Sequence, residues 1–187
     1  WVMKKTSTVL KLAAALIALV ILSGCASGVV PGGIVTEDKD FSDFTRVEVE
    51  GAFEVTIVQA DSYSTAISAD DNFFDYITIT QEGDTLRIYL NPHHTFADFT
   101  QPARTLKVDI TMPVLDSLGI SGASKANISA FKSKSTLKLV ISGASSVTLV
   151  DIEAGDLEFE VSGASKLSGS LKGNDSEIEV SGASTLD

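Results

Sequence analysis

Ser117-Leu118-Gly119-Ile120-Ser121-Gly122-Ala123-Ser124 is the first of four related stretches in the C-terminal half of the chain. Each stretch is a short alternating segment followed by the tetrapeptide Ser-Gly-Ala-Ser, which recurs at 142–145, 162–165 and 181–184. Successive tetrapeptides begin 21, 20 and 19 residues apart. Self-similarity at a short, nearly constant period is typical of proteins built from stacked repeats, in which each repeat packs on its neighbours.

The segments before the tetrapeptides alternate between apolar and polar residues, which predicts strands with one buried face. The positions expected to be buried are Leu118, Ile120, Leu139, Ile141, Phe159, Val161, Ile178 and Val180. A second alternating segment follows each tetrapeptide and begins with Ala126-Ile128, Val147-Leu149, Leu167 and Leu186. Each repeat therefore contains at least two short strands that meet at a Ser-Gly-Ala-Ser corner.

The repeats contain neither the 3.6-residue periodicity of helices nor the signature of leucine-rich repeats. We therefore predict an all-β fold, a right-handed parallel β-helix (solenoid) with coils of about 20 residues. The corner glycines are expected to adopt positive φ, and the serine columns to form hydrogen bonds between coils. These structural glycines are Gly122, Gly143, Gly163 and Gly182.

Residues 41–113 are also rich in alternating segments but are less repetitive. Gly51-Ala52 resembles a degenerate corner, Glu82-Gly83-Asp84 predicts a hairpin turn, and residues 70–76 predict a short helix or turn. We expect 41–187 to form one domain continuous with the repeats. Because the sequence printed here stops three residues after the fourth tetrapeptide, we expect this domain to be C-terminally truncated, or completed by a partner.

The first 25 residues have the organisation of a bacterial export signal. Lys4 and Lys5 form a basic start, and residues 12–22 are an apolar run too short to span a bilayer. Leu22-Ser23-Gly24-Cys25 resembles the lipoprotein box, in which the cysteine is acylated and becomes the new N-terminus. We predict a signal peptide over 1–24, a membrane anchor at Cys25 and a flexible tether over 25–40.

The charge distribution restricts the possible partners. The chain carries 25 acids and 14 bases, and three of the bases precede Cys25, so the remainder has a net charge of 11 − 25 = −14. A surface of this sign repels nucleic acid and anionic lipid headgroups. Any partner is therefore expected to be neutral or basic, or to be bridged by divalent cations.

A family resemblance rests on several short motifs. They are Phe44-x-x-Val47-x-Val49-x-Gly51-x-Phe53-x-Val55, Ile57-x-Gln59, Leu86-x-Ile88, Val108-x-Ile110-x-Met112-Pro113 and the serial Ser-Gly-Ala-Ser words. Together they resemble the head GIN domain, whose members are described as auto-transporter adhesins. The resemblance covers about residues 41–187 and implies a parallel β-helix on an exported protein. It implies no catalytic residues, so none are transferred.

Four groups of residues carry atoms that suit reactive or metal-binding sites. His93-His94 with Asp98, and Asp70-Asp71-Asn72 with Asp75, carry ligand atoms without a recognised metal-binding spacing. The tetrapeptide serines lack the second glycine of a nucleophile elbow, and two histidines cannot serve four of them. The carboxylates of Glu158, Glu160, Glu177 and Glu179 suit glycoside chemistry, although they also alternate as a solvated strand face does.

These observations predict a non-catalytic envelope lipoprotein that presents a binding surface, as an adhesin does. It needs no cofactor or metal, and its partners are the membrane, through Cys25, and a glycan or protein ligand rather than nucleic acid. We expect an exported protein of the outer membrane or cell surface, with the periplasmic face as the alternative. Two other functions stay open: a carbohydrate-active enzyme, either lyase or hydrolase, and a scaffold or sensing protein of the envelope.

Overall fold

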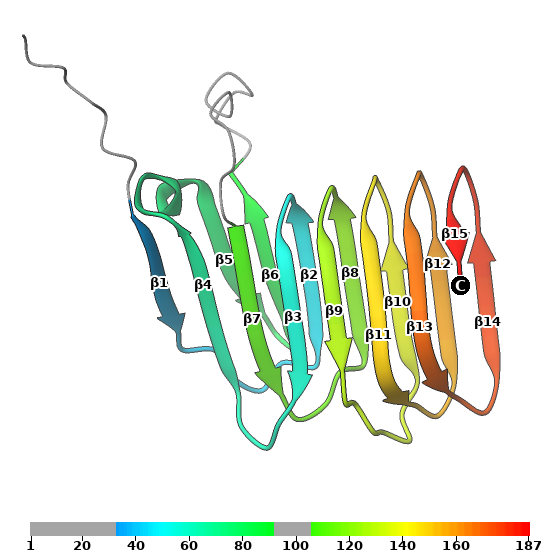
Figure 1. Cartoon of the computed structure of the whole chain (residues 1–187). Helices are drawn as coiled ribbons and strands as arrows, with labels where there is room; N and C mark the ends of the chain where they lie inside the picture. Colours follow the sequence, from blue (N-terminus) through cyan, green and yellow to red (C-terminus); the bar gives the residue numbers. More distant parts are fainter. Residues whose placement is uncertain (1–32, 92–105) are drawn as a thin grey trace, which may run out of the picture. The chain divides into compact units, whose positions relative to one another are not determined.

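The computed structural model describes residues 33–91 and 106–187, which form two β-sheets with their apolar faces against one core (Figure 1). The seven-stranded sheet has the order β14 (Ser176–Val180), β12 (Leu157–Val161), β10 (Leu137–Ile141), β8 (Ser117–Gly122), β2 (Arg46–Gly51), β6 (Thr85–Leu90), β5 (Ile77–Glu82). The eight-stranded sheet has the order β1 (Ile34–Lys39), β4 (Ser64–Asp70), β7 (Leu106–Met112), β3 (Glu54–Gln59), β9 (Lys125–Ser129), β11 (Ser146–Glu153), β13 (Lys166–Lys172), β15 (Thr185–Leu186).

The four repeats form four layers, each with one strand in either sheet. The strand before each tetrapeptide lies in the seven-stranded sheet and the strand after it in the eight-stranded sheet. Neighbouring layers pair in parallel with equivalent residues in register. Period-two alternation places the apolar residues of both sheets inward, and the predicted columns are buried in the first three layers.

The corner glycines stack directly on one another. Gly122 has φ +83° and Gly143 has φ +77°, a region that L-residues with a side chain rarely adopt. The amide of Ala144 donates to the carbonyl oxygen of Gly122 at 2.7 Å, and the same bond recurs at the next corners. Gly51 lies at the base of this stack, in register with Gly122, so the degenerate corner predicted there is confirmed.

The prediction of a right-handed parallel β-helix is wrong, although the all-β class is confirmed. Both sheets are mixed: β4 is antiparallel to β1 and β7, and β5 is antiparallel to β6. In addition, the strand order does not follow the chain, because β2 lies between β6 and β8 and β3 lies between β7 and β9. A uniform coil would place successive turns of chain side by side, and this arrangement does so only from β8 onward.

Local turns explain why the N-terminal half departs from the repeat. The predicted turn at Gly83, which has φ +62°, reverses the chain so that β5 and β6 form an antiparallel hairpin. After β3 the chain also reverses, and β4 leads into the 3-10 helix η1 (Asp71–Tyr76), as the sequence predicted. After β2 and β3, the chain thus places β4 to β7 on one side of these two strands and β8 to β15 on their other side.

The strand β1 lies within the stretch 25–40 that the composition predicts to be a tether. It pairs with β4 along six residues, and the Thr36 and Ser68 hydroxyls are 2.7 Å apart. Most of its side chains are exposed, so the strand depends on backbone hydrogen bonds that a polar sequence does not reveal. The folded unit therefore begins before position 41.

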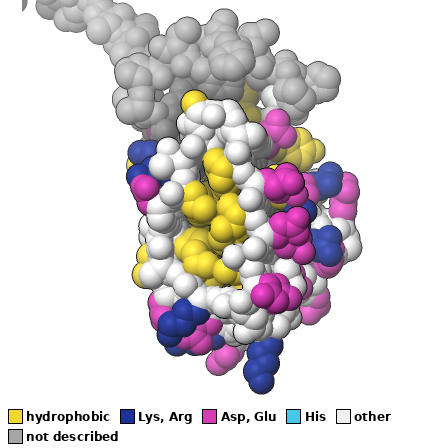
Figure 2. Space-filling model, turned by 90° about the vertical axis from the view of Figure 1, so that its right-hand side faces the viewer, with side chains coloured by type: hydrophobic (Ala, Val, Ile, Leu, Met, Phe, Trp, Pro, Cys, Tyr) yellow, Lys and Arg dark blue, Asp and Glu magenta, His cyan; other side chains and the backbone are white. Residues whose placement is uncertain are grey.

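The apolar residues of the last layer, formed by β14 and β15, are much more exposed than their equivalents in the other layers. Val161 is 1% exposed in β12, whereas Val180, the equivalent residue of β14, is 46% exposed. Figure 2 looks onto this end and shows apolar side chains reaching the surface between polar rims. Within the described residues, no helix has the length and apolar character needed to cross a bilayer.

Candidate binding site on the seven-stranded sheet

The outer face of the seven-stranded sheet carries the side chains that alternate with the core residues. Strand register aligns them in rows that cross the strands. One row consists of Thr78, Tyr89, Glu50, Ser121 and Ser142. A parallel row consists of Thr80, Arg87, Glu48, Gly119, Val140 and Glu160. Because every strand between β5 and β10 is paired on both sides, the backbone holds these rows in fixed positions.

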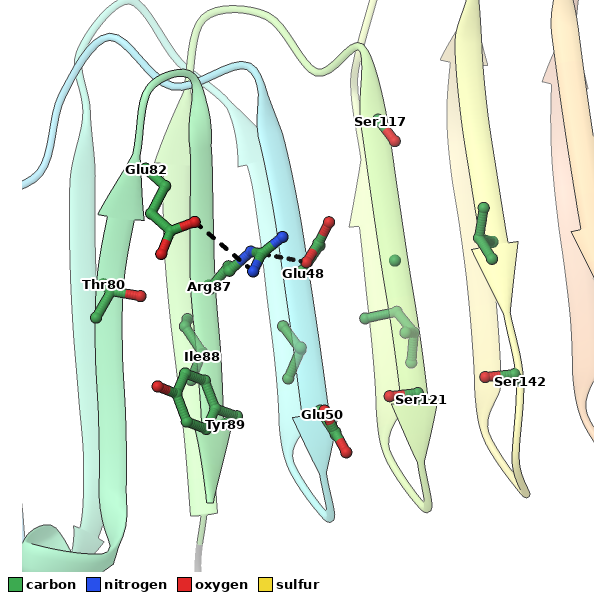
Figure 3. A pocket seen from close by; sticks show the side chains of 14 residues that line it. Glu48, Glu50, Thr80, Glu82, Arg87, Ile88, Tyr89, Ser117, Ser121 and Ser142 are labelled. Atoms are coloured by element: carbon green, nitrogen blue, oxygen red, sulfur yellow. Dashed lines mark ion pairs between the residues drawn. The ribbon is translucent and has the colours of Figure 1, made fainter. Parts of the chain in front are cut away.

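The face is hollowed where β8 crosses these rows. The hollow has a volume of about 500 Å³ and extends from β5 to β10, with the small residues of β8 as its floor (Figure 3). We call it the Gly119 hollow and define it by Arg87, Tyr89, Glu50, Gly119, Ser121 and Ser142. Tyr89 and Glu50 lie on one side of β8 and Ser142 lies on the other.

A short network of ion pairs orients the guanidinium group in the hollow. Arg87 Nε lies 3.0 Å from a carboxylate oxygen of Glu48, and its Nη1 lies 3.7 Å from Glu82 (Figure 3). Arg87 and Glu48 are about half exposed and Glu82 is more exposed still, so these pairs add little to stability. Glu50 is the third carboxylate of the lining, so the lining has a formal charge of 1 − 3 = −2.

Gly119 differs from the corner glycines because the fold does not require it. It has no positive φ, and a Cβ added there would meet nothing closer than 3.4 Å, the Cγ of Glu48. Its equivalents in the next layers are Val140, Glu160 and Glu179, all of which carry side chains. A glycine inside a strand costs stability and is often found where a ligand approaches the backbone. The absence of a side chain at Gly119 leaves the floor of the hollow open.

The acidic residues considered for glycoside chemistry lie on the same face, farther along the sheet. Glu158 and Glu160 of β12 stand directly opposite Glu177 and Glu179 of β14, and all four are exposed. Lys138 donates to Glu160 at 2.8 Å, and this hydrogen bond raises the pKa of Lys138 above its ordinary value. Glu158 and Glu160 are thus ion-paired with Lys138, and all four glutamates belong to a solvated strand face.

The other residues that the sequence indicated as corners, candidate metal ligands or a lipidation site either do not line the hollow or lie outside the described residues. Gly122, Gly143, Gly163 and Gly182 occupy the corners, each with positive φ. Asp70 is the last residue of β4, and Asp71 and Asp75 lie in η1. Within residues 33–91 and 106–187, no group of three or more His, Cys, Asp or Glu side chains is close enough together to hold a metal ion. Cys25, His93, His94 and Asp98 lie outside the described residues.

The buried serines of the tetrapeptides bond to the backbone rather than to one another. Ser124 Oγ accepts from the amide of Phe53 at 3.1 Å and donates to Gly51 O at 3.2 Å, while Ser165 Oγ donates to Gly143 O at 3.4 Å. Ser145 Oγ is buried, and none of the described residues offers it a hydrogen-bond partner. The hydroxyls of Ser124 and Ser165 thus fasten their corners to the layer beside them, which is a structural role.

Sequence reasoning did not identify the Gly119 hollow. Its lining comes from β5, β6, β2, β8 and β10, which are brought together only by the non-sequential strand order. One signal was available: Gly119 interrupts an alternating segment at a position where the other repeats carry a side chain. That signal indicates an open place on the sheet but does not tell which residues surround it.

Comparisons with known proteins agree on the fold. A crystal structure of a "putative adhesin" from Parabacteroides distasonis superposes with a TM-score of 0.56 at 18% identity, covering 83% of this chain and 73% of that one. A "putative lipid binding protein" from the same organism gives 0.56 at 19%, covering 83% and 68%. A "putative adhesin" from Bacteroides fragilis gives 0.51 at 12%, covering 82% and 96%. At these identities the likeness concerns the fold alone.

No protein of curated function matches the sequence. The sequence does match the family model described as "Putative auto-transporter adhesin, head GIN domain" over residues 43–187, which include every strand except β1. The resemblance inferred from the motifs between Phe44 and Met112 and from the serial corners is thereby confirmed. The chain belongs to the head GIN domain family.

Proposed function

We propose that this protein is an exported lipoprotein of the bacterial envelope that binds a ligand at the cell surface without transforming it, as an adhesin does. The observation that carries the proposal is the Gly119 hollow. It combines an aromatic ring, a guanidinium held by carboxylates and several hydroxyls, and its central strands β6, β2 and β8 are paired on both sides. Such preorganised polar groups around an aromatic side chain are typical of binding sites.

The lining favours binding over catalysis. Its residues include no histidine, cysteine or lysine, so the hydroxyls of Ser117, Ser121 and Ser142 have no imidazole or amine beside them as a base. Arg87 is engaged by Glu48 and Glu82, an arrangement that fixes a contact surface rather than freeing a charge for a reaction. Glycoside hydrolysis uses a pair of carboxylates as acid and base or nucleophile. Of the three carboxylates in the lining, Glu48 and Glu82 are ion-paired with Arg87, which favours the non-catalytic function over the lyase or hydrolase alternative.

The N-terminal sequence supports export and anchoring. Its basic start, apolar run and Leu22-Ser23-Gly24-Cys25 box occur in the order of a lipoprotein signal, and an acylated cysteine holds a protein on a membrane by its lipid chains. The family description names an adhesin, and so do the titles of two of the structural relatives. We extend both to this chain as part of the proposal.

Fractionation of cells tests the anchor. Wild-type protein should carry a lipid at Cys25 by mass spectrometry and sediment with membranes, whereas Cys25→Ala should be neither acylated nor retained there. Protease added to intact cells should degrade the wild-type body while a periplasmic marker stays intact. Protection of residues 33–187 from protease would show that they face the periplasm and would contradict the proposed adhesin function.

Assays of cell attachment and of oligosaccharide cleavage test the binding function. Cells that express the protein should attach to glycan- or matrix-coated surfaces more than a deletion strain does, and complementation should restore attachment. Incubation with oligosaccharides should leave their chain lengths unchanged by mass spectrometry. Shortened or unsaturated products would indicate the enzyme alternative, and equal attachment of both strains would favour an envelope scaffold.

A further inference from the structure

We propose that the Gly119 hollow is a saccharide-binding site for an extended, uncharged oligosaccharide that runs across the strands. This inference rests on the proposed binding function and names the ligand class for the same site. Tyr89 supplies the surface on which a sugar ring stacks, and Glu50, Ser121 and Ser142 supply hydrogen bonds to ring hydroxyls. Gly119 leaves the space that the ring occupies.

The first argument is the chemistry of the lining. A pyranose ring has a C–H face that packs on an aromatic ring and a rim of hydroxyls that both donate and accept hydrogen bonds. Tyr89 is half-buried, which fixes its ring while leaving part of it accessible. The carboxylate of Glu50 accepts hydrogen bonds, the guanidinium of Arg87 donates them, and the hydroxyls of Ser121 and Ser142 can do both.

The second argument is repetition along the row. Tyr89, Glu50, Ser121 and Ser142 lie on four adjacent strands in one line across the sheet (Figure 3). Neighbouring strands are about 4.8 Å apart, which is close to the length of one sugar unit in an extended chain. A polymer of such rings can therefore place one ring over each successive strand.

The third argument excludes other ligand classes. The formal charge of −2 in the lining disfavours acidic glycans and phosphate groups. An extended peptide binds most readily at a free strand edge, where it adds backbone hydrogen bonds. Strands β6, β2 and β8 are each paired on both sides, so the floor of the hollow offers a peptide no such edge.

The fourth argument is Gly119 itself. Its backbone conformation and surroundings accept a side chain, and the next layer carries Val140 in the same position. A β-branched residue there should pair well across the strands and should stabilise the sheet. The glycine lowers intrinsic strand stability and gains only open volume at the floor, which is the arrangement expected where a ligand must approach the backbone.

Titration calorimetry on the purified full-length lipoprotein in detergent tests the inference, with cellohexaose and N-acetylchitohexaose as neutral probes and oligogalacturonate of the same length as the acidic probe. We expect at least one neutral probe to bind with a dissociation constant in roughly the millimolar to micromolar range. Oligogalacturonate should bind at least about tenfold more weakly.

Matched variants assign the binding to the hollow. Gly119→Val should weaken binding about tenfold or more while leaving the thermal midpoint unchanged or higher, so loss of folding cannot explain the loss of binding. Tyr89→Ala should weaken binding about tenfold and Tyr89→Phe by less than about threefold, because the phenyl ring retains the stacking surface. Thr148→Val on the outer face of the eight-stranded sheet is the control and should bind as the wild type does.

Specific outcomes would overturn the inference. They are the absence of binding to both neutral probes, equal binding by wild type and Gly119→Val, and tighter binding of oligogalacturonate. If cells with Gly119→Val attach to surfaces as well as wild-type cells, the proposed adhesion stands and the saccharide site fails. If the oligosaccharides bind in the hollow but are cleaved, the saccharide site stands and the non-catalytic function fails.

Discussion

At the scale of single residues, the glycines of this protein are under three different degrees of structural constraint. At the corners, backbone conformation and close approach both demand glycine: a Cβ added to Gly143 would lie 2.3 Å from the carbonyl oxygen of Gly122. At Gly83 the φ is also positive, but nothing lies within 4 Å of an added Cβ. At Gly119 neither constraint applies.

We expect Gly143→Ala to destabilise the protein far more than Gly83→Ala. A left-handed conformation costs a residue with a side chain about 1–2 kcal/mol, which is the whole cost at Gly83. At Gly143 the clash with Gly122 of the preceding corner adds to this cost, so we expect the free energy of unfolding to fall by at least about 3 kcal/mol. Urea unfolding followed by circular dichroism measures both, and equal losses would contradict the stacking of the corners.

The buried serines provide a second matched pair. Ser124→Ala removes the acceptor for the amide of Phe53 and should cost about 1–3 kcal/mol, because a buried N–H is left without a partner. Ser145→Ala removes a buried hydroxyl that has no hydrogen-bond partner in the described part of the chain, so the variant should lie within about 0.5 kcal/mol of the wild type or be more stable. Unfolding free energies in urea distinguish the two, and a larger loss for Ser145→Ala would refute this assignment.

At the scale of elements, the position of a layer determines how much its apolar residues contribute. The equivalent strands β12 and β14 have nearly the same sequence, Leu-Glu-Phe-Glu-Val and Ser-Glu-Ile-Glu-Val. The first has neighbours on both sides, whereas among the described residues the second pairs with β12 alone. Burial therefore follows from position in the stack as well as from strand pattern.

Truncation of equivalent valines tests this dependence. Val161→Ala leaves a cavity in the core and should lower the free energy of unfolding by about 2 kcal/mol. Val180→Ala removes methyl groups that are already half in water and should cost less than about 1 kcal/mol. Chemical denaturation of both variants provides the comparison, and a cost at Val180 equal to that at Val161 would indicate that β14 is covered in solution.

At the scale of the whole molecule, the order of strands in space determines which parts are most stable. The strands β2 and β3 come early in the chain, yet each lies between two parallel partners near the middle of its sheet. Their contacts join segments far apart in sequence, such as β2 with β8. Folding of the two halves is therefore coupled through these two strands.

Hydrogen exchange of the native protein measures this coupling. Amides of β2 and β3 should be the most protected, because exchange there requires opening of both neighbours, and amides of β14 and β15 should exchange fastest. The repeated corners should show graded protection that increases from the fourth tetrapeptide to the first, although their sequences are identical. Uniform protection across the four corners would contradict a stack whose order determines local stability.

Local periodicity and glycine geometry can be read from neighbouring residues, and they predicted the alternating strands and the corners. The short motifs predicted the family. Leu118 and Ile120 were recognisable as buried, and Gly122 as a corner, from their immediate neighbours. The tertiary structure alone decided that β2 lies between β6 and β8, that the sheets are mixed, and that the Gly119 hollow exists. Strand pairing joins segments distant in the chain, and alternation specifies which face of a strand is buried but not which strand lies beside it.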